Sequence, residues 1–127
     1  MSASPDPRAR SILVEELADW RGQDVVDERG DKLGKLDDVL YDGESDHPAF
    51  AAVRSGTLSK HLTYVPLVGA TVGREYVRLR LTKAALKKAP TFDPDMQLTA
   101  EDEAGIYGFY GMDYAPTAEG GRRLARR

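Results

Sequence analysis

The sequence predicts a mainly β fold, a small and strongly bent β-barrel followed by two short C-terminal helices. Short segments rich in β-branched and aromatic residues recur between residues 24 and 81, with turn residues between them. Segments with helical spacing come only after this region, which argues against alternating β-α-β units. The length of 127 residues and an apolar content of 41% suit one domain with a modest core.

The first predicted elements surround tight turns. Residues 12–14 are expected to form a short strand, followed by a turn of helix through Trp20 that Gly22 closes. The next strand is expected at residues 24–26. Asp27 and Gly30 stand at the first and last positions of the following four-residue segment. Aspartate and glycine at these positions are typical of a type I turn.

Residues 32–42 follow this turn and are predicted to form a strand. Leu33 falls out of phase with Leu36, and a bulge at Gly34 would restore the alternation. A helix is the alternative interpretation, because Leu33, Leu36 and Leu40 are spaced three and four residues apart. The glycine and the turn signals on both sides favour the strand.

Three further strands are predicted, over residues 47–56, 60–72 and 75–81. The second is interrupted by Pro66, which donates no ladder hydrogen bond and therefore marks an edge or a bulge. In the third strand apolar and polar residues alternate strictly, so one face of the strand should be buried and the other exposed. The residues expected to be buried are Val77, Leu79 and Leu81, and those expected to be exposed are Arg78 and Arg80.

Two short helices with capping signals come next. Residues 82–90 have Thr82 as a candidate N-cap and Pro90 as a stop signal. Thr99 caps the second helix, with Asp102 three residues on, near the pattern of a capping box. The predicted divisions of the chain are a disordered arm (1–10), a barrel domain (11–90), a linker and Tyr/Gly-rich helical extension that packs on the barrel (91–115), and a disordered basic tail (116–127).

Charge is distributed unevenly along the chain. Residues 11–118 carry 12 Lys and Arg against 19 Asp and Glu, a net charge of −7, whereas residues 119–127 carry four Arg and one Glu, a net charge of +3. The acidic main part of the chain is unsuited to binding nucleic acid, because the phosphates require a basic face. Nucleic acid is therefore not expected as a partner except through the tail arginines, which are Arg122, Arg123, Arg126 and Arg127.

The most acidic segment, residues 27–46, holds six aspartates and two glutamates but no metal-binding pattern. An EF-hand register that begins at Asp27 or Asp42 places Lys32 or His47 where a glycine is required. Neither histidine of the chain has a partner at zinc spacing. No metal or cofactor is expected, and the acids are predicted to flank turns and to face solvent.

Asp38 is a separate case within this segment. The predicted strand places it on the same face as Leu36 and Leu40, so it should be partly buried. A buried carboxylate must be hydrogen-bonded or paired. One interpretation is a general acid or base. The favoured one is structural, with Asp38 accepting hydrogen bonds from the backbone or from arginine and so fixing the barrel.

The sequence offers little for catalysis. There is no cysteine, and Ser55 and Ser59 lie near His61 without the G-x-S-x-G pattern of a nucleophile elbow. The glycines at every third position near residue 108 lie in a helical segment and not after a strand, so they form no phosphate loop. The chain is therefore predicted not to be an enzyme, with a hydrolase as a remote alternative.

Four aromatic residues crowd into eight positions of the predicted extension. They are the candidate interaction residues Tyr107, Phe109, Tyr110 and Tyr114. The three tyrosines are spaced three and four residues apart, so they would form one stripe on a helix. The stripe either docks onto the barrel of its own chain or forms a partner or dimer surface, where tyrosine is enriched.

Residues 17–90 resemble the PRC-barrel family. The resemblance is carried by a G-x-x-V…G…L-G-K-L-x-D…D pattern that begins at Gly22, by the segment TYVPL, and by the segment EYVRLRLTKAALKKAP. It implies a small bent barrel that serves as a binding and assembly module, as in the H subunit of photosynthetic reaction centres and in a ribosome maturation factor; neither of those functions is carried over. The family supplies no catalytic residues. The positions assigned structural roles are Gly22, Gly30, Gly34, Asp38 and Pro66.

The expected function is therefore a non-enzymatic PRC-barrel module that binds another protein. A homodimer is predicted, with residues 104–114 contributing to its interface. A cytoplasmic location is expected, because cysteine is absent and no apolar run is long enough for a membrane helix or a signal peptide. The alternative is a ribosome- or RNA-associated factor that uses the basic tail.

Overall fold

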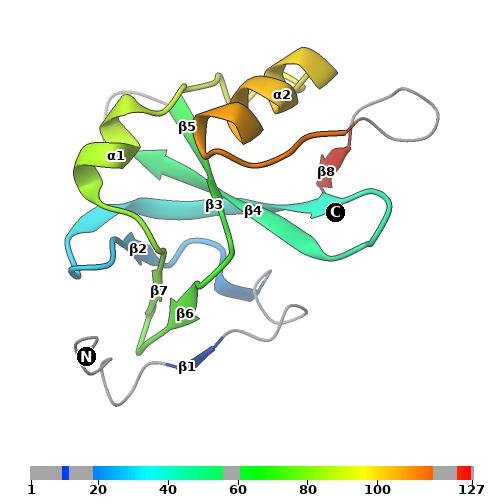
Figure 1. The fold of residues 1–127 in the computed structure, drawn as a ribbon. Helices are drawn as coiled ribbons and strands as arrows, with labels where there is room; N and C mark the ends of the chain where they lie inside the picture. Colours follow the sequence, from blue (N-terminus) through cyan, green and yellow to red (C-terminus); the bar gives the residue numbers. More distant parts are fainter. Residues whose placement is uncertain (1–9, 12–18, 56–60, 116–122, 127) are drawn as a thin grey trace.

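The computed structural model describes residues 10–11, 19–55, 61–115 and 123–126. This part of the chain is mainly β with two helices, as predicted (Figure 1). The elements are β1 (Arg10–Ser11), β2 (Asp24–Val26), β3 (Lys32–Asp42), β4 (Pro48–Ser55), β5 (His61–Pro66), β6 (Thr71–Val72), β7 (Tyr76–Arg78), α1 (Lys83–Lys88), α2 (Ala100–Phe109) and β8 (Leu124–Arg126).

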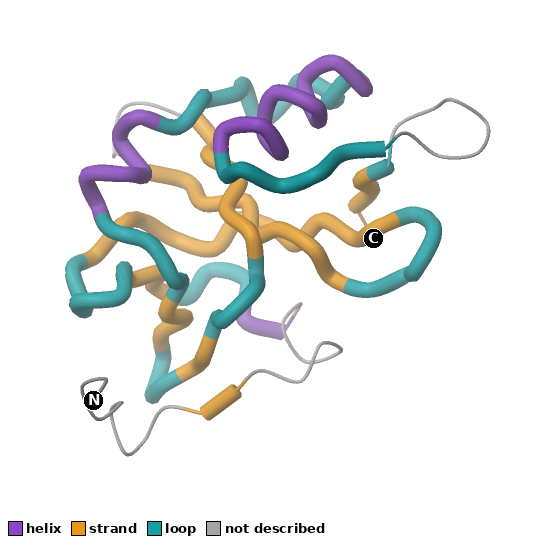
Figure 2. Tube along the Cα trace, viewed as in Figure 1, coloured by secondary structure: helices purple, strands orange, loops and turns teal. Residues whose placement is uncertain are grey.

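The strands form one bent sheet in the order β1-β6-β7-β2-β3-β4-β5, and β8 pairs with β3 off this path. The pairing of β2 with β7 is parallel, and the other pairings are antiparallel. The two ends of the path are not joined, so the sheet curls without closing. Figure 1 and Figure 2 show both helices on one side of the long central strands, and β1, β2, β6 and β7 on the other.

Strand β3 bends at two bulges. Val25 pairs with Gly34 and Val26 with Lys32, so Leu33 is the extra residue, next to the predicted bulge position. A Cβ atom at Gly34 would collide with the carbonyl oxygen of Arg54 on β4, which explains the glycine. The strand interpretation of residues 32–42 is therefore confirmed.

The second bulge in β3 changes which side chains share a face. Leu36 pairs with Val53 and Asp38 with Ala52, which leaves Asp37 as the extra residue. The predicted common face of Leu36, Asp38 and Leu40 is therefore wrong, because the bulge places Leu36 in a different apolar cluster from Leu40. A pattern with a strict period of two gives no sign of such a shift.

Two apolar clusters lie on opposite faces of β4 and β5. The inner cluster fills the concave side of the sheet and includes Val25, Leu36, Val39, Val53, Val77 and Leu79. The outer cluster lies under α2 and β8 and includes Leu40, Phe50, Leu62, Tyr64, Ile106, Tyr107 and Leu124. Because both faces are covered, four consecutive residues are buried in the middle of β4 and four in β5, in place of an alternating pattern.

The predicted faces of the segment around β7 are largely correct. Val77 and Leu79 are fully buried and Leu81 is 8% exposed. Arg80 is exposed, but Arg78 is half-buried and its guanidinium lies 5.7 Å from the ring centroid of Tyr76. Strand pairing ends at Arg78, earlier than expected.

Strand β5 forms one end of the sheet, and its outward edge is covered. Leu62 exchanges two backbone hydrogen bonds with Phe92 from the linker, at 2.8 and 2.9 Å. The carbonyl oxygen of Tyr64 accepts a hydrogen bond from the Tyr110 hydroxyl at 2.7 Å. Pro66 ends the strand and has no N–H group, as an edge position allows. This edge therefore offers little for pairing with another strand.

Both helices have the predicted caps. The Thr82 hydroxyl accepts a hydrogen bond from the backbone N–H of Ala85 and begins α1. Thr99 and Asp102 form a reciprocal capping box at the start of α2.

The termini differ from the prediction where the structure describes them. Arg10, assigned to the disordered arm, pairs with Val72 of β6. Residues 124–126, assigned to the disordered tail, form β8, and Tyr41 pairs with Ala125. The rest of the predicted arm, the predicted strand at 12–14 and residues 116–122 lie outside the described residues.

Candidate interaction surface

The acidic segment is more buried than expected, beginning with Asp27. This side chain is 1% exposed, and it accepts backbone hydrogen bonds from Arg29, Asp31 and Lys83 at 2.8 to 3.0 Å. Burial opposes its ionisation, but these N–H groups outweigh burial and lower its pKa. Asp27 therefore ties the turn after β2 to the start of α1, and the prediction that it faces solvent is wrong.

Asp38 has the predicted structural contacts. Its carboxylate accepts hydrogen bonds from Arg21 at 3.0 Å, from Arg126 at 3.3 Å and from the backbone N–H of Val39 at 2.8 Å. The neighbouring Asp37 accepts hydrogen bonds from Arg54 on β4, the shorter at 2.6 Å. These contacts join β3 to the strands on both sides.

The basic tail binds the acidic strand. The Arg123 Nε atom lies 2.7 Å from Asp42 Oδ2, and its Nη1 atom lies 3.0 Å from the carbonyl oxygen of Ala115 and 3.4 Å from Glu44. Burial raises the pKa of Asp42, but the hydrogen bonds from Arg123 and from two backbone N–H groups outweigh it, so the net shift is downward. Two tail arginines are thus paired with carboxylates of β3, the partly buried Arg123 with Asp42 and the exposed Arg126 with Asp37 and Asp38.

Glu103 on α2 also anchors the tail segment that contains Arg123. This carboxylate is fully buried on α2 and accepts hydrogen bonds from the N–H groups of Arg123 and Leu124, at 2.6 and 2.8 Å. The Tyr114 hydroxyl donates a third hydrogen bond at 2.7 Å. Nothing in the sequence singles out Glu103, because an acid in the first turn of a helix is adequately explained by the helix dipole.

The tyrosine stripe packs on its own chain. Tyr107 is buried, with its ring centroid 5.1 Å from that of Phe50, and Tyr110 bonds to β5 as described above. The helix ends at Phe109, and Gly111 has a φ of +69°, so Tyr114 reaches Glu103 from the following segment and not from the helix. Of the four predicted interaction residues, Phe109 is the one that is exposed, at 39%.

The hydroxyls of Tyr110 and Tyr114 are not acid–base groups near neutral pH. Burial raises the pKa of Tyr110 to about 12. Burial, followed by the hydrogen bond to Glu103, raises the pKa of Tyr114 to about 12. Both hydroxyls therefore stay protonated and act as hydrogen-bond donors.

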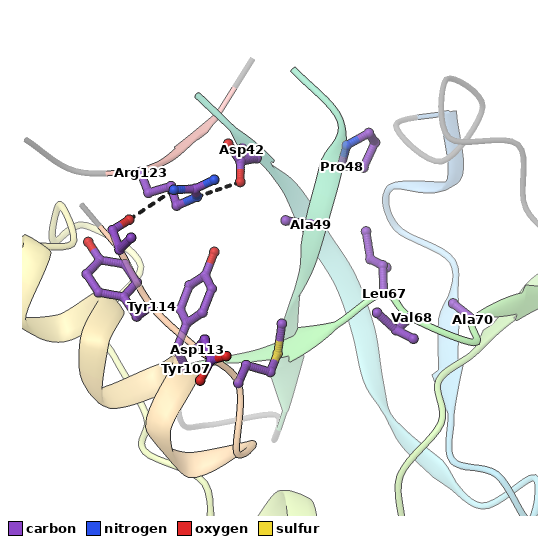
Figure 3. Close-up of a pocket in the computed structure, with 12 residues that line it drawn as sticks. Asp42, Pro48, Ala49, Leu67, Val68, Ala70, Tyr107, Asp113, Tyr114 and Arg123 are labelled. Atoms are coloured by element: carbon purple, nitrogen blue, oxygen red, sulfur yellow. Dashed lines mark hydrogen bonds and ion pairs between the residues drawn. The ribbon is translucent and has the colours of Figure 1, made fainter. Parts of the chain in front are cut away.

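A hollow of about 530 Å³ opens between the bent sheet and the segment that follows α2 (Figure 3). Leu67, Val68 and Ala70 from the β5–β6 connection lie on one side of it, and Tyr107 and Tyr114 lie on the other. The ion pair of Asp42 with Arg123 closes one end. The remaining lining residues are Pro48, Ala49, Met112, Asp113 and Ala115.

A second hollow, of about 300 Å³, adjoins the first. The two hollows share Val68 and Met112, so these residues lie between them. The second is otherwise lined by Val65, Pro66, Arg80, Leu81 and Tyr110. We call the two hollows and the residues that line them the Val68 surface.

Val68 stands at the tip of a defined turn. The N–H of Ala70 donates to the carbonyl oxygen of Leu67 at 3.0 Å, and Gly69 has a φ of +80°, as the third residue of a type II turn requires. The N–H of Leu67 donates to Ala49, which fixes the turn to β4. The Val68 side chain is 70% exposed, so this turn holds a large apolar group out into solvent.

A family model of the PRC-barrel domain matches residues 14–86, more than half of the chain. The chain belongs to the PRC-barrel family. No curated protein matches it. The PRC-barrel match spans the sheet from β2 to β7 and ends within α1. Helix α2 and strand β8, which cover the outer cluster, therefore come from residues beyond the matched domain.

The structural positions named from sequence have clear roles in this PRC-barrel. Gly22 and Gly30 have φ values of +87° and +91°, and each lies in a turn. The N–H of Gly22 donates to the carbonyl oxygen of Leu36, and the N–H of Gly30 donates to that of Asp27. Gly34 allows β3 to approach β4 closely, and Pro66 ends β5. Asp38 forms ion pairs with Arg21 and Arg126.

The described part of the PRC-barrel chain contains no group of three His, Cys, Asp or Glu residues arranged to hold a metal. Ser55 and His61 are cross-strand partners on β4 and β5, and Ser59 lies outside the described residues. Neither helix in the described ranges is long and apolar enough to cross a bilayer.

Proposed function

We propose that this PRC-barrel chain is a non-enzymatic protein-interaction module and that the Val68 surface is its binding site. The observation that supports the proposal most is the exposure of Val68 between two hollows with largely apolar walls. Single exposed apolar residues are common, but an exposed residue continuous with a hollowed apolar surface is typical of a binding site. A cytoplasmic location is part of the proposal.

The contacts of the other candidates favour the Val68 surface. The tyrosines predicted to contact a partner contact their own chain instead. Tyr110 donates a hydrogen bond to Tyr64 and Tyr114 donates one to Glu103, while Tyr107 packs against Phe50. The outward edge of β5 is covered by Phe92 and Tyr110. Phe109 stacks edge-on against Tyr110 with centroids 4.9 Å apart, so it borders the same surface.

The RNA-binding alternative has less support. A tail that binds phosphates needs free cations. Arg123 and Arg126 are instead paired with carboxylates of β3.

Site-specific photo-cross-linking in cells tests the proposal. A photoreactive amino acid at Val68 should give a discrete cross-linked protein band. The same amino acid at Met96, which is 56% exposed and lines neither hollow, serves as the control. Equal labelling at both positions, or cross-links to RNA alone, would contradict the proposal.

A further inference from the structure

We propose that the partner seated on the Val68 surface is a second copy of this chain, related by a two-fold axis that passes near Val68 and Met112. This inference rests on the proposed function and names its partner. A two-fold contact uses the same surface on both copies, so that surface must complement itself. Two features of the Val68 surface, its shape and its charge, meet this requirement, and a third favours association.

The first feature is shape. Val68 projects from its turn at 70% exposure, directly beside a hollow of about 530 Å³ with an apolar wall of Pro48, Ala49 and Leu67. One copy therefore carries both a projecting side chain and a recess next to it. A two-fold axis between them places Val68 of each copy at the recess of the other.

The second feature is charge. Asp113 lines the larger hollow and Arg80 lines the smaller one, so the two charges lie on opposite sides of Val68 and Met112. Both side chains are exposed, and neither has an ion-pair partner among the residues that the structure describes. A two-fold axis through the centre exchanges the two sides and brings Asp113 of one copy opposite Arg80 of the other.

The third feature is rigidity, which lowers the entropy lost on association. The turn that carries Val68 is closed by a backbone hydrogen bond and held to β4 by another. The aliphatic part of Arg80 packs against Gly69 so closely that a Cβ atom there would lie 2.7 Å from Arg80 Cδ. The projecting residue and one of the two charges are thus set in place before a partner arrives.

Sedimentation equilibrium of the full chain, from about 1 to 100 µM, tests the inference, since this range brackets Kd values typical of weak dimers. The wild type should show a monomer–dimer equilibrium. Val68→Asp should raise the dimer Kd at least about tenfold, because it places a charge against the apolar wall of Pro48, Ala49 and Leu67. Met96→Asp is the matched control and should leave the Kd unchanged.

A charge exchange tests the two-fold axis itself. Arg80→Glu and Asp113→Arg should each weaken the homodimer, because like charges then face each other. An equimolar mixture of the two variants should recover dimers, since both cross-contacts in that heterodimer pair opposite charges. Circular dichroism of each variant confirms that the fold is intact.

The outcomes separate this inference from the proposed function. A wild type that stays monomeric at 100 µM, or a dimer unaffected by Val68→Asp, would overturn the second copy as partner. Cross-linking at Val68 to a different protein would then leave the binding surface standing. Loss of both the dimer and every cross-link at Val68 would remove the proposed function as well.

Discussion

The Nε atom of Arg123 lies 2.7 Å from the Oδ2 atom of Asp42, which joins the basic end of the chain to the acidic strand β3. The two side chains are 22% and 15% exposed, so solvent screens their interaction only in part. The contact lies where β8 begins its pairing with β3. It pairs one arginine of the basic tail with one carboxylate of the acidic body.

Arg123→Ala should destabilise the protein by about 1–3 kcal/mol, because it leaves Asp42 buried without its partner. Arg126→Ala is the matched control, since Arg126 lies close by in β8 and its side chain is 39% exposed. It should cost under about 1 kcal/mol. Urea unfolding monitored by circular dichroism measures both. Equal losses of stability in the two variants would show that the ion pair of Arg123 with Asp42 contributes no more than the exposed pairs of Arg126.

Stability should fall in acid through Asp27 and Asp42, whose pKa values are lowered in the folded protein. A group with a lowered pKa stabilises the folded state fully above its unfolded pKa, which is 3.8 for aspartate. This contribution is lost as pH falls through the lower folded value. The free energy of unfolding should therefore decline below about pH 4 and on towards about pH 2.

Asp42→Asn separates one of these two contributions. The variant should be less stable than the wild type at pH 7, and the difference should shrink as the pH falls towards about 2. Urea titrations at several pH values measure the two curves. Curves that stay parallel across this range would show that the ionisation of Asp42 is not linked to folding.

Glu103→Gln should destabilise the protein by about 1–3 kcal/mol, because an amide presents one acceptor oxygen where the carboxylate presents two. Tyr114→Phe removes a single hydrogen bond to Glu103 and should cost about 0.5–1.5 kcal/mol. The two effects should not add, since the residues are in contact. A double-mutant cycle by urea unfolding measures the coupling.

Hydrogen exchange gives a second readout for Glu103. The N–H of Leu124 donates to its carboxylate at 2.8 Å, so this amide should exchange faster in Glu103→Gln than in the wild type. Amides of β4 and β5, which lie in strands that pair with each other, serve as the internal control. Unchanged exchange at Leu124 would contradict the anchoring role.

Gly34→Ala and Gly105→Ala should have opposite effects. A Cβ at Gly34 meets the Arg54 carbonyl, so strand β3 or β4 must shift, at a cost of about 1–3 kcal/mol. A Cβ at Gly105, in the middle of α2, has no neighbour within 4 Å apart from its chain neighbours and the backbone of its own helix, so alanine there should stabilise the protein by up to about 1 kcal/mol. Thermal melts of the two variants measure the contrast. Destabilisation by both would show that α2 depends on its glycine for another reason.

The sequence by itself determined the features that depend on neighbouring residues. The Asp27–Gly30 turn, the caps at Thr82 and Thr99, and the buried face of Val77 and Leu79 all follow from chemistry within a few positions. Turn and cap preferences act through local backbone geometry, so they can be recognised without the fold. The fold class follows from the same local signals and their order.

Only the tertiary structure decided the pairings between distant segments. Arg123 is 81 positions from Asp42, and Glu103 is 20 positions from Arg123, yet these three residues fix β8. The opposite charges of body and tail were visible in the sequence, but which arginine meets which aspartate depends on the bulges of β3. Val68 likewise becomes a candidate contact only when its turn lies beside Met112, because neither residue carries a local signal of its partner.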